Sequence, residues 1–546
     1  MGKVASYLQS HLSGEVFDDD QMRKRFSTDA SVLSMTPSVV VYPRTTNDIR
    51  KIARFSWQLA EKKHTLPITA RGSGTDQTGA AIGKGIIMVF PAHMNKILEL
   101  DSQQKLVRVQ PGVNFKSLQE TLQTHGLHIP VFPSSYKYST IGGAIANNAY
   151  GEKSLKYGSI ADWVDKLEVV LANGELIQTG RIGRKEIDKK KGLTTLEGEI
   201  YRIVDAVLSE NDDVLDEYYD KLRVTKDSIG YALADVRRRD GSIDLTPIFV
   251  GSQGTLGVIS EAILRAEPYN PKTELLVAAF ESFDNITEVV TRLRNLGPSM
   301  IDMVDDNFLE FIQQQQSVNL PENLKSPDYK PSFLLFVEFD NPGKAKLKKA
   351  KQAMKIVKAY TDHCLLTNDF DEKEQYLIIR HATSEVVNYH QGGKASLPII
   401  DAAAVPVEYL FDFIQMIYRI FDKFKLPVMV WGHAGDANLH VHPFLDLAKL
   451  TDRQKVFQIM EEYYKEVVKI GGTISAEQGD GRIRVPFVKL QVGDKMLDLF
   501  KIIKSGFDPH NLLNPGVKIG TDPKQLGEAL RKEYSLAHFA DHLPRT

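Results

Sequence analysis

The sequence predicts a protein of mixed strand and helix layers, α/β or α+β, and three observations support this prediction. The chain has 546 residues, enough for three to five domains at ~100–200 residues each. Its hydrophobic fraction of 42% and charged fraction of 25% are those of globular proteins and exclude a fibre or a largely disordered chain. Residues 38–180 alternate short β-branched runs with amphipathic stretches, which is typical of packed strands and helices.

Apolar periodicity gives the predicted elements in chain order. We expect strands at 38–42, 66–70, 85–90, 107–109, 274–280 and 332–339. We expect helices at 114–126, 286–295 and 407–421, and one that Thr46 or Asn47 caps. The turn-rich segment 267–271 predicts a domain boundary near residue 268. The basic segment 181–191 is predicted to be a solvated loop.

Composition and charge exclude several classes of protein. The 68 basic and 70 acidic side chains nearly cancel, so no overall field favours nucleic acid as a partner. The single cysteine, Cys364, rules out an internal disulfide and an iron–sulfur cluster, which needs about four cysteine ligands. The N-terminal segment has no long apolar stretch, and charges interrupt the apolar segment 397–421. We therefore expect a soluble cytoplasmic protein, and peripheral contact with the inner face of a membrane stays open.

Three segments rich in small residues predict one extended ligand. The segment 71–79 (RGSGTDQTG) follows a predicted strand, and its successive N–H groups can form an anion-binding nest. Its spacing matches neither GxGxxG nor a P-loop, and a plain glycine turn is the alternative. Two further segments, 133–158 and 251–259, are similarly rich in small residues. Three such segments suit a flat dinucleotide such as FAD better than three unrelated turns.

Three histidines and a glutamate form a candidate metal site. His433, His440 and His442 follow an apolar run, and His440 and His442 share a face if this segment is extended. Glu477 comes later in the chain, and His and carboxylate ligands suit Zn²⁺ or a similar divalent ion. Because the spacing is not that of an HExxH motif, buried hydrogen-bonded histidines are the alternative.

The order of these motifs resembles the PCMH-type FAD-binding domain of the vanillyl-alcohol-oxidase and D-lactate-dehydrogenase superfamily. The matching segments are 37–43, 71–75, 133–158, 251–259 and the closing FDPHNLLNPG at 507–516. The resemblance implies an α+β fold, in which a two-subdomain FAD-binding domain precedes an antiparallel-sheet FAD-linked oxidase C-terminal domain. We divide the chain into an N-terminal segment (1–36), the FAD-binding domain (37–268), a substrate or cap domain (269–495) and a segment that returns to the FAD domain (496–546).

The resemblance also implies a set of cofactor-binding residues. The first loop holds no histidine, unlike family members with covalently attached flavin, so we expect non-covalent FAD. Gln253 stands where the family usually has Glu, and we expect little effect. The implied FAD contacts are Arg71, Gly72, Ser73, Gly74, Thr75, Asp76, Pro133, Ser134, Thr140, Gly142, Gly143, Ala146, Asn147, Gly151, Tyr157, Gly158, Gly257, Ile259 and Asn514.

The segments GHAGDANLH and SAE are similar to those of FAD-linked D-2-hydroxy-acid dehydrogenases. This similarity implies that His433, His440 and Glu477 bind a divalent metal, Zn or Mn, beside the substrate. The sequence departs from the family at Gln478, where a histidine thought to act as base is usual, and glutamine cannot accept a proton near neutral pH. His442 stands where the family has Asn and is a candidate base, and His381 is a second.

The resemblance implies a substrate anchor and a reaction. Arg380 matches the arginine that holds the substrate carboxylate, and Lys394 is a weaker candidate for this role. The implied reaction is oxidation of a D-lactate-like 2-hydroxy acid to the 2-oxo acid, with hydride transfer to flavin N5. The sequence has no NAD or haem motif, so a quinone, an electron-transfer protein or oxygen would take the electrons. The alternatives are a metal-free FAD-dependent alcohol or sugar oxidase, a catalytically impaired FAD-binding protein, and a metal-dependent hydrolase.

Overall fold

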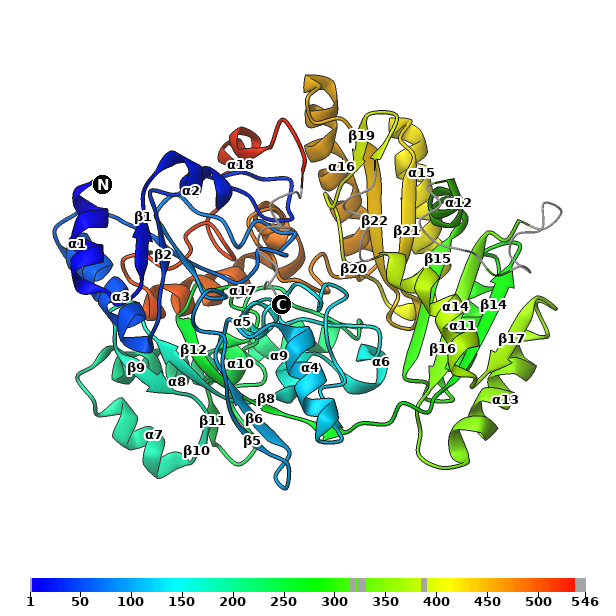
Figure 1. Ribbon diagram of the computed structural model, residues 1–546, viewed down its shortest axis with the longest axis horizontal. Coiled ribbons are helices and arrows are strands. Elements are labelled where there is room, and N and C mark those ends of the chain that lie inside the picture. Colours follow the sequence, from blue (N-terminus) through cyan, green and yellow to red (C-terminus); the bar gives the residue numbers. More distant parts are fainter. Residues whose placement is uncertain (1, 315–320, 322–329, 384–389, 536–546) are drawn as a thin grey trace.

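The computed structural model describes residues 2–314, 321, 330–383 and 390–535, and it places them in two parts that meet along a broad seam (Figure 1). The first part contains the chain up to about residue 268 together with the last helices. The second part is built on one large sheet. The predicted α+β class is confirmed: among the described residues, parallel strand pairs occur only in one small sheet, and the other sheets are antiparallel.

The first part begins with a four-stranded sheet of order β1-β2-β4-β3. Strands β2 and β4 pair in parallel, as do β3 and β4, because the helix α3 and the glycine-rich loop provide the crossovers. Thr45 caps α3 by accepting a hydrogen bond from the Asp48 backbone N–H. The elements are α1 (Lys3–His11), β1 (Glu15–Phe17), α2 (Asp20–Arg25), β2 (Val39–Tyr42), α3 (Thr46–Glu61), β3 (Ile68–Arg71) and β4 (Ile86–Val89).

A second, antiparallel sheet of order β5-β6-β12-β8-β9 completes the FAD-binding part. Its strands are β5 (Ile97–Asp101), β6 (Leu106–Val109), β8 (Val164–Val170), β9 (Leu176–Gln178) and β12 (Val258–Arg265), and two short pairs join β10 (Arg181–Ile182) to β11 (Ile243–Asp244) and β7 (Leu127–His128) to β13 (Glu267–Pro268). The helices are α4 (Phe115–Thr124), α5 (Ile141–Ala146), α6 (Ser154–Tyr157), α7 (Arg184–Lys191), α8 (Leu196–Glu210), α9 (Asp212–Lys221) and α10 (Thr246–Phe249).

The prediction of a loop at 181–191 is wrong, because residues 184–191 form the helix α7. Lys, Arg and Glu have high helix propensity, and Ile187 gives the helix one buried contact. Two lysines at its C-terminal end also form ion pairs with residues of α8, Lys190 with Glu197 and Lys191 with Asp205. The charged segment is therefore a helix that ion pairs attach to α8.

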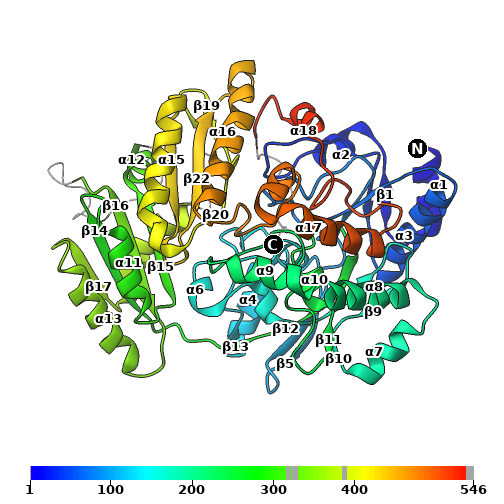
Figure 2. The same ribbon diagram turned by 180° about the vertical axis from the view of Figure 1, so that it is seen from behind.

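The second part is a nine-stranded antiparallel sheet with helices on both faces (Figures 1 and 2). The sheet contains β14 (Glu274–Phe280), β15 (Met300–Asp305), β16 (Phe333–Phe339), β17 (Cys364–Thr367), β18 (His390–Gln391), β19 (Lys394–Ser396), β20 (Ala403–Ala404), β21 (Val428–His433) and β22 (Asn438–Leu445). The helices are α11 (Ile286–Arg294), α12 (Asp306–Gln314), α13 (Ala345–Val357), α14 (Phe370–His381), α15 (Leu410–Phe424) and α16 (Leu450–Lys469).

Strand alternation decides which side chains face which helices. Leu276 and Ala278 belong to the core that contains α11, α13 and α15, whereas Leu275 and Val277 pack with α12 and α14. Residues two positions apart on the other strands follow the same rule. The face that α12 and α14 cover is therefore the one on which Met300 and Val304 of β15 and Trp431 of β21 lie.

The chain then returns to the first part. Helix α17 (Val485–Phe507) packs against α8 and α9, as seen from behind in Figure 2, and α18 (Pro523–Ala529) follows it. The backbone of Ile68 in β3 exchanges hydrogen bonds with Leu512 and Asn514, so the C-terminal turn joins the four-stranded sheet. Among the residues described, none of the helices combines the length and apolar character needed to span a bilayer.

Candidate functional site

A cavity of about 480 Å³ opens between the two parts and brings both predicted sites together. This volume lies in the usual range of ligand sites, about 300–1,000 Å³. The FAD-binding part contributes Arg71, Gly72, Ser73, Gly74, Thr75, Asp76, Pro133, Ser134, Thr140, Gly142, Gly143, Ala146, Asn147, Gly151, Gly257 and Ile259. The second part and its C-terminal extension contribute Thr383, Trp431 and the predicted Arg380, His433, His440, His442, Glu477 and Gln478.

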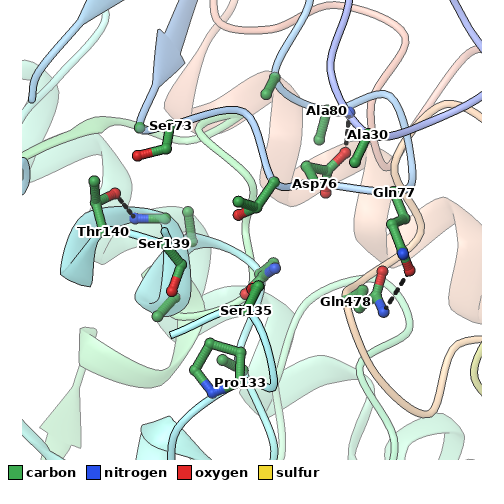
Figure 3. Close-up of a pocket in the computed structure, with 18 of the residues that line it drawn as sticks. Ala30, Ser73, Asp76, Gln77, Ala80, Pro133, Ser135, Ser139, Thr140 and Gln478 are labelled. Atoms are coloured by element: carbon green, nitrogen blue, oxygen red, sulfur yellow. Dashed lines mark hydrogen bonds between the residues drawn. The ribbon is translucent and has the colours of Figure 1, made fainter. Parts of the chain in front are cut away.

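Glycines in the first part leave room that a side chain would fill. A Cβ on Gly72 would lie 2.2 Å from Thr140 Oγ1, the oxygen that caps α5 by accepting from the Gly143 backbone N–H (Figure 3). Gly74 has a φ of +78°, and a Cβ there would lie 2.2 Å from Arg71 Nη2. The wall is therefore made largely of backbone, which a flat ligand can approach closely.

The first glycine-rich loop holds a buried cation. Arg71 Nη1 donates to the carbonyl oxygens of Thr28 and Ala81, while Nε and Nη2 have no hydrogen-bond partner. Burial lowers the pKa of Arg71 to about 10, so the guanidinium stays charged at neutral pH. Unpaired N–H groups on a buried cation are costly unless a ligand satisfies them. This orphaned donor set, together with the backbone wall, fits a cofactor that carries phosphate groups.

The loop keeps its shape through Asp76, whose side chain serves the backbone. Its carboxylate accepts hydrogen bonds from the backbone N–H groups of Thr78 and Ala80, and the second of these is drawn in Figure 3. Burial raises the pKa of Asp76, although these hydrogen bonds oppose the shift. The carboxylate of Asp76 thus holds the loop, and the predicted contact of this residue with the cofactor would follow from its place in the cavity lining.

Three metal-type donors converge on the other side of the cavity. His433 ends β21 and His440 lies on the adjacent antiparallel strand β22, where Trp431 is paired with His440. Glu477 Oε1 lies 3.5 Å from His433 Nε2, and its Oε2 lies 3.9 Å from His440 Nε2. One donor atom from each residue lies within 4.8 Å of the others. Two imidazoles and a carboxylate are a donor set that Zn²⁺ or Mn²⁺ accepts.

A carboxylate orients each of the two imidazoles. His433 Nδ1 lies 3.0 Å from Asp302 Oδ1, and His440 Nδ1 lies 2.9 Å from Asp401 Oδ1. Burial alone would raise the pKa of both aspartates, but the neighbouring histidines hold it below the ordinary value. Each histidine thus donates from Nδ1 and presents Nε2 to Glu477, as is common around protein metal ions. The site fits a divalent metal for this reason as well as for its donor set.

The sequence motifs predicted neither of these aspartates, and they did not predict Lys226. Asp302 and Asp401 each interrupt an apolar run, which is the signal that could have identified them. Lys226 comes from the FAD-binding part, and its side chain is only 2% exposed. Its Nζ lies 2.5 Å from Glu477 Oε1 and 3.0 Å from Asn438 Oδ1. The lysine and the histidines, against the opposing effect of burial, lower the pKa of Glu477 to about 2.

Arg380 lies on the same face of the large sheet as the imidazoles. Its side chain extends from α14, and its Nε donates to Asp302 Oδ2 at 2.5 Å. Nη1 donates to Thr383 Oγ1 at 2.7 Å, which leaves Nη2 as the nitrogen without a hydrogen bond among the described residues. Asp302 thereby fixes Arg380 and His433 together, so the anchor and the metal donors form one rigid unit.

His442 and Gln478 complete this end of the cavity. His442 is buried, its Nδ1 lies 3.3 Å from Ser396 Oγ, and its Nε2 has no hydrogen-bond partner. Burial lowers the pKa of His442 and favours the neutral ring. Gln478 Nε2 donates to Gln77 Oε1 across the seam (Figure 3) and to Asp401 Oδ2.

The amide at position 253 also links the two parts. Gln253 Nε2 donates to Thr78 Oγ1 and to the carbonyl oxygen of Gln478. Its Oε1 accepts from the Gly481 backbone N–H. A glutamate here could not donate the first two bonds when ionised, so the amide has a definite structural consequence.

Several predicted residues do not line the cavity. The hydroxyl of Tyr157 donates to Asp340 across the seam beside Gly158, and Asn514 Nδ2 donates to the carbonyl oxygens of Ala80 and Gln253. Lys394 lies on β19 outside the lining. His381 also lies outside it, with Nε2 3.2 Å from Glu152 Oε1 and a side chain 47% exposed. These side chains position the walls or the seam.

Comparison with known proteins agrees with this geometry. Residues 37–180 match the FAD binding domain family, and residues 270–517 match the family of FAD linked oxidases, C-terminal domain. The chain is 29% identical over 520 residues to glycolate oxidase subunit GlcD of Bacillus subtilis (strain 168), covering 94% of this chain and 95% of that protein. It is 29% identical over 505 residues to D-2-hydroxyglutarate dehydrogenase of Pantoea ananatis (strain AJ13355), covering 90% of this chain.

The chain spans about half the length of that second relative, since the match covers 49% of it. Among solved structures, p-cresol methylhydroxylase with substrate bound superposes with a TM-score of 0.66 at 16% identity, covering 96% of this chain and 97% of the other. At this identity the likeness concerns the fold alone.

Proposed function

The chain belongs to the PCMH-type FAD-linked oxidoreductases, and from this premise we propose that it oxidises a D-2-hydroxy acid to the corresponding 2-oxo acid. The observation that carries the proposal is the shared cavity. Arg380 and the His433–His440–Glu477 cluster line the same space as the glycine-rich wall, so a small acid held by them would lie against a bound flavin. The two relatives, named for glycolate and D-2-hydroxyglutarate, support a 2-hydroxy acid as the substrate class.

Two groups would supply the chemistry that amino acids lack. When bound, FAD supplies the two-electron oxidant, and Zn²⁺ or Mn²⁺ on His433, His440 and Glu477 supplies a Lewis acid for the 2-hydroxyl group. The residues of the chain bind and orient the acid, and they accept the hydroxyl proton.

Arg380 is the proposed carboxylate anchor. Its Nε and Nη1 are held by Asp302 and Thr383, so the guanidinium plane is fixed before substrate arrives. The remaining Nη2 can donate a charge-assisted hydrogen bond to a substrate carboxylate. Because Asp302 also holds His433, the carboxylate and the hydroxyl of one small acid are received at a fixed separation.

His442 is the proposed proton acceptor. His442 lines the cavity, and its buried Nε2 lies 3.6 Å from Asp401 Oδ1 without a hydrogen bond to a described residue. Burial favours the neutral ring that can take a proton. Gln478 holds Asp401 and Gln77 in place, which is an orienting role that an amide can perform. His381 lies outside the lining, so it is the weaker candidate. An external quinone, electron-transfer protein or oxygen would reoxidise the flavin.

Anaerobic mixing with a panel of D- and L-2-hydroxy acids, with the flavin absorbance recorded, tests the proposal. We expect D-2-hydroxy acids to bleach the flavin and to yield the 2-oxo acid in equal amount, and the L-enantiomers to react far more slowly. A purified FAD-containing protein that no 2-hydroxy acid bleaches would contradict the proposal.

A further inference from the structure

One carboxylate in the cavity takes no part in the proposed chemistry. Glu152 follows Gly151, a residue of the predicted flavin wall, and lines the same space as Arg380. Its side chain is 16% exposed, and its Oε1 lies 3.2 Å from His381 Nε2. Burial alone would raise the pKa of Glu152, but His381, Arg380 and Lys153 hold it far below the ordinary value. Glu152 is therefore ionised across the neutral range.

The field of Glu152 reaches the substrate anchor. It favours the charged form of Arg380 and opposes that of Asp302, so the three groups lie within electrostatic range of one another. Arg380 is already paired with Asp302, and the Lys153 ammonium is paired with Glu338 at 2.6 Å. His381 is left as the partner of Glu152, from outside the lining. The anchor thus has one arginine and two carboxylates around it.

Apart from the proposed metal ion, the cavity has few cationic groups. Among its described lining residues, Arg71 and Arg380 are the two that carry a permanent positive charge, and Arg71 belongs to the cofactor loop. Lys394 lies outside the lining. A substrate with two carboxylates would find one anchoring arginine. Its second carboxylate would share the cavity with Glu152, a like charge.

We propose that Glu152 is a specificity determinant that makes this site accept 2-hydroxy acids with an uncharged side chain and reject dicarboxylates. The inference rests on the proposed function and narrows it to substrates such as glycolate and D-lactate. The physical basis is the negative charge of Glu152, which lines the cavity while its partner His381 lies outside the lining. This charge penalises a second substrate carboxylate and leaves a hydrogen or methyl side chain untouched. One fixed carboxylate can thus separate acids that share the same 2-hydroxy group.

The test compares D-lactate with D-2-hydroxyglutarate on the FAD- and metal-loaded enzyme, by kcat/KM and by the substrate concentration that half-maximally reduces the flavin. For the wild type we expect kcat/KM to favour D-lactate at least about tenfold. Glu152→Gln, which keeps the size and removes the charge, should shift this ratio towards D-2-hydroxyglutarate by about tenfold, mainly through the half-maximal concentration. Glu120→Gln on α4, where the side chain is 61% exposed, removes an equal charge outside the cavity and should leave the ratio as in the wild type.

The outcomes separate this inference from the proposed function. If the wild-type protein prefers D-2-hydroxyglutarate, the inference is overturned without any variant. The inference can therefore be refuted even if Glu152→Gln does not fold. If Glu152→Gln changes the ratio of kcat/KM for the two acids by less than twofold, the inference is also overturned, while the proposed function stands. If neither these two acids nor any other 2-hydroxy acid reduces the flavin, the proposed function fails and the inference falls with it.

Discussion

The glycine-rich wall and the metal-and-anchor cluster share one cavity but are built in opposite ways. The wall uses backbone from a few contiguous segments, such as 71–76 and 140–147. The cluster uses charged side chains brought from distant places, with Lys226 on one side of the seam and Asp302, Arg380, Asp401 and Glu477 on the other. A backbone site leaves a local signature in the sequence, whereas a side-chain site depends on contacts that only the fold creates. A substitution in one half should therefore impair the function of that half and leave the ligand of the other half bound.

Loss of a metal donor should have the largest effect. His433→Ala removes one of three donors, so we expect metal to be lost and turnover to fall at least about a thousandfold, while FAD stays bound. Elemental analysis, the flavin spectrum and kcat check the three parts. His64→Ala, at an exposed position, is the control. Unchanged metal content would remove His433 from the donor set.

Loss of the anchor should come next. Arg380→Ala removes the proposed carboxylate contact, and we expect anaerobic flavin reduction to slow about a hundredfold with FAD retained. The variant also leaves the buried Asp302 with His433 as its remaining charged partner, so the melting temperature should drop, and rates are compared well below that temperature. Arg292→Ala on α11, where the side chain is 45% exposed, is the matched control. Wild-type reduction rates in Arg380→Ala would show that another group anchors the substrate.

An orienting carboxylate should have a smaller effect than a donor. Asp401→Asn keeps the shape but weakens the hold on His440 Nδ1, and we expect metal affinity to fall about 10- to 100-fold. Titration of the metal-free protein with Zn²⁺ or Mn²⁺ measures this change. Asp498→Asn, where the side chain is 62% exposed, serves as the reference. Equal affinities of the two variants would mean that Asp401 does not support the metal.

A change in the glycine-rich wall should weaken FAD binding and leave the metal in place, and its effect should be the smallest of the four. Gly74→Ala places a Cβ against Arg71 at a φ of +78°, which costs an L-residue enough to weaken FAD binding about tenfold. Metal content should stay at the wild-type level. Gly183→Ala, which meets no atom within 4 Å, tests whether any added methyl has this effect. If Gly74→Ala lost metal and kept FAD, the separation of the two halves would be wrong.

The sequence predicted most of the wall, whereas in the cluster it predicted the metal donors and Arg380 but not the residues that hold them in place. The strands at 38–42, 85–90 and 274–280 were visible because their apolar patterns are local, and β2, β4 and β14 confirm them. Asp302 and Asp401 could be recognised only as acids inside apolar runs. Asp302 meets His433 because β15 pairs with β21, and Asp401, in the loop before β20, meets His440 because β20 pairs with β22.

Other residues escaped prediction because their partners are distant in sequence. Lys226 lies in a polar stretch that gives no sign of burial, and its partner Glu477 is 251 positions away. Helix α7 was missed because the ion pairs that stabilise it are formed with residues of another helix, α8. Tyr157 and Asn514 were predicted to touch the cofactor, but the structure places them in the seam and behind the wall.

Metal removal by a chelator, followed by anaerobic mixing with D-lactate, tests the central claim most directly. The account predicts that the protein keeps its FAD, that D-lactate no longer bleaches the flavin, and that added Zn²⁺ or Mn²⁺ restores bleaching. A metal-depleted protein in which D-lactate bleaches the flavin at the original rate would contradict the claim that one cavity serves both halves of the site.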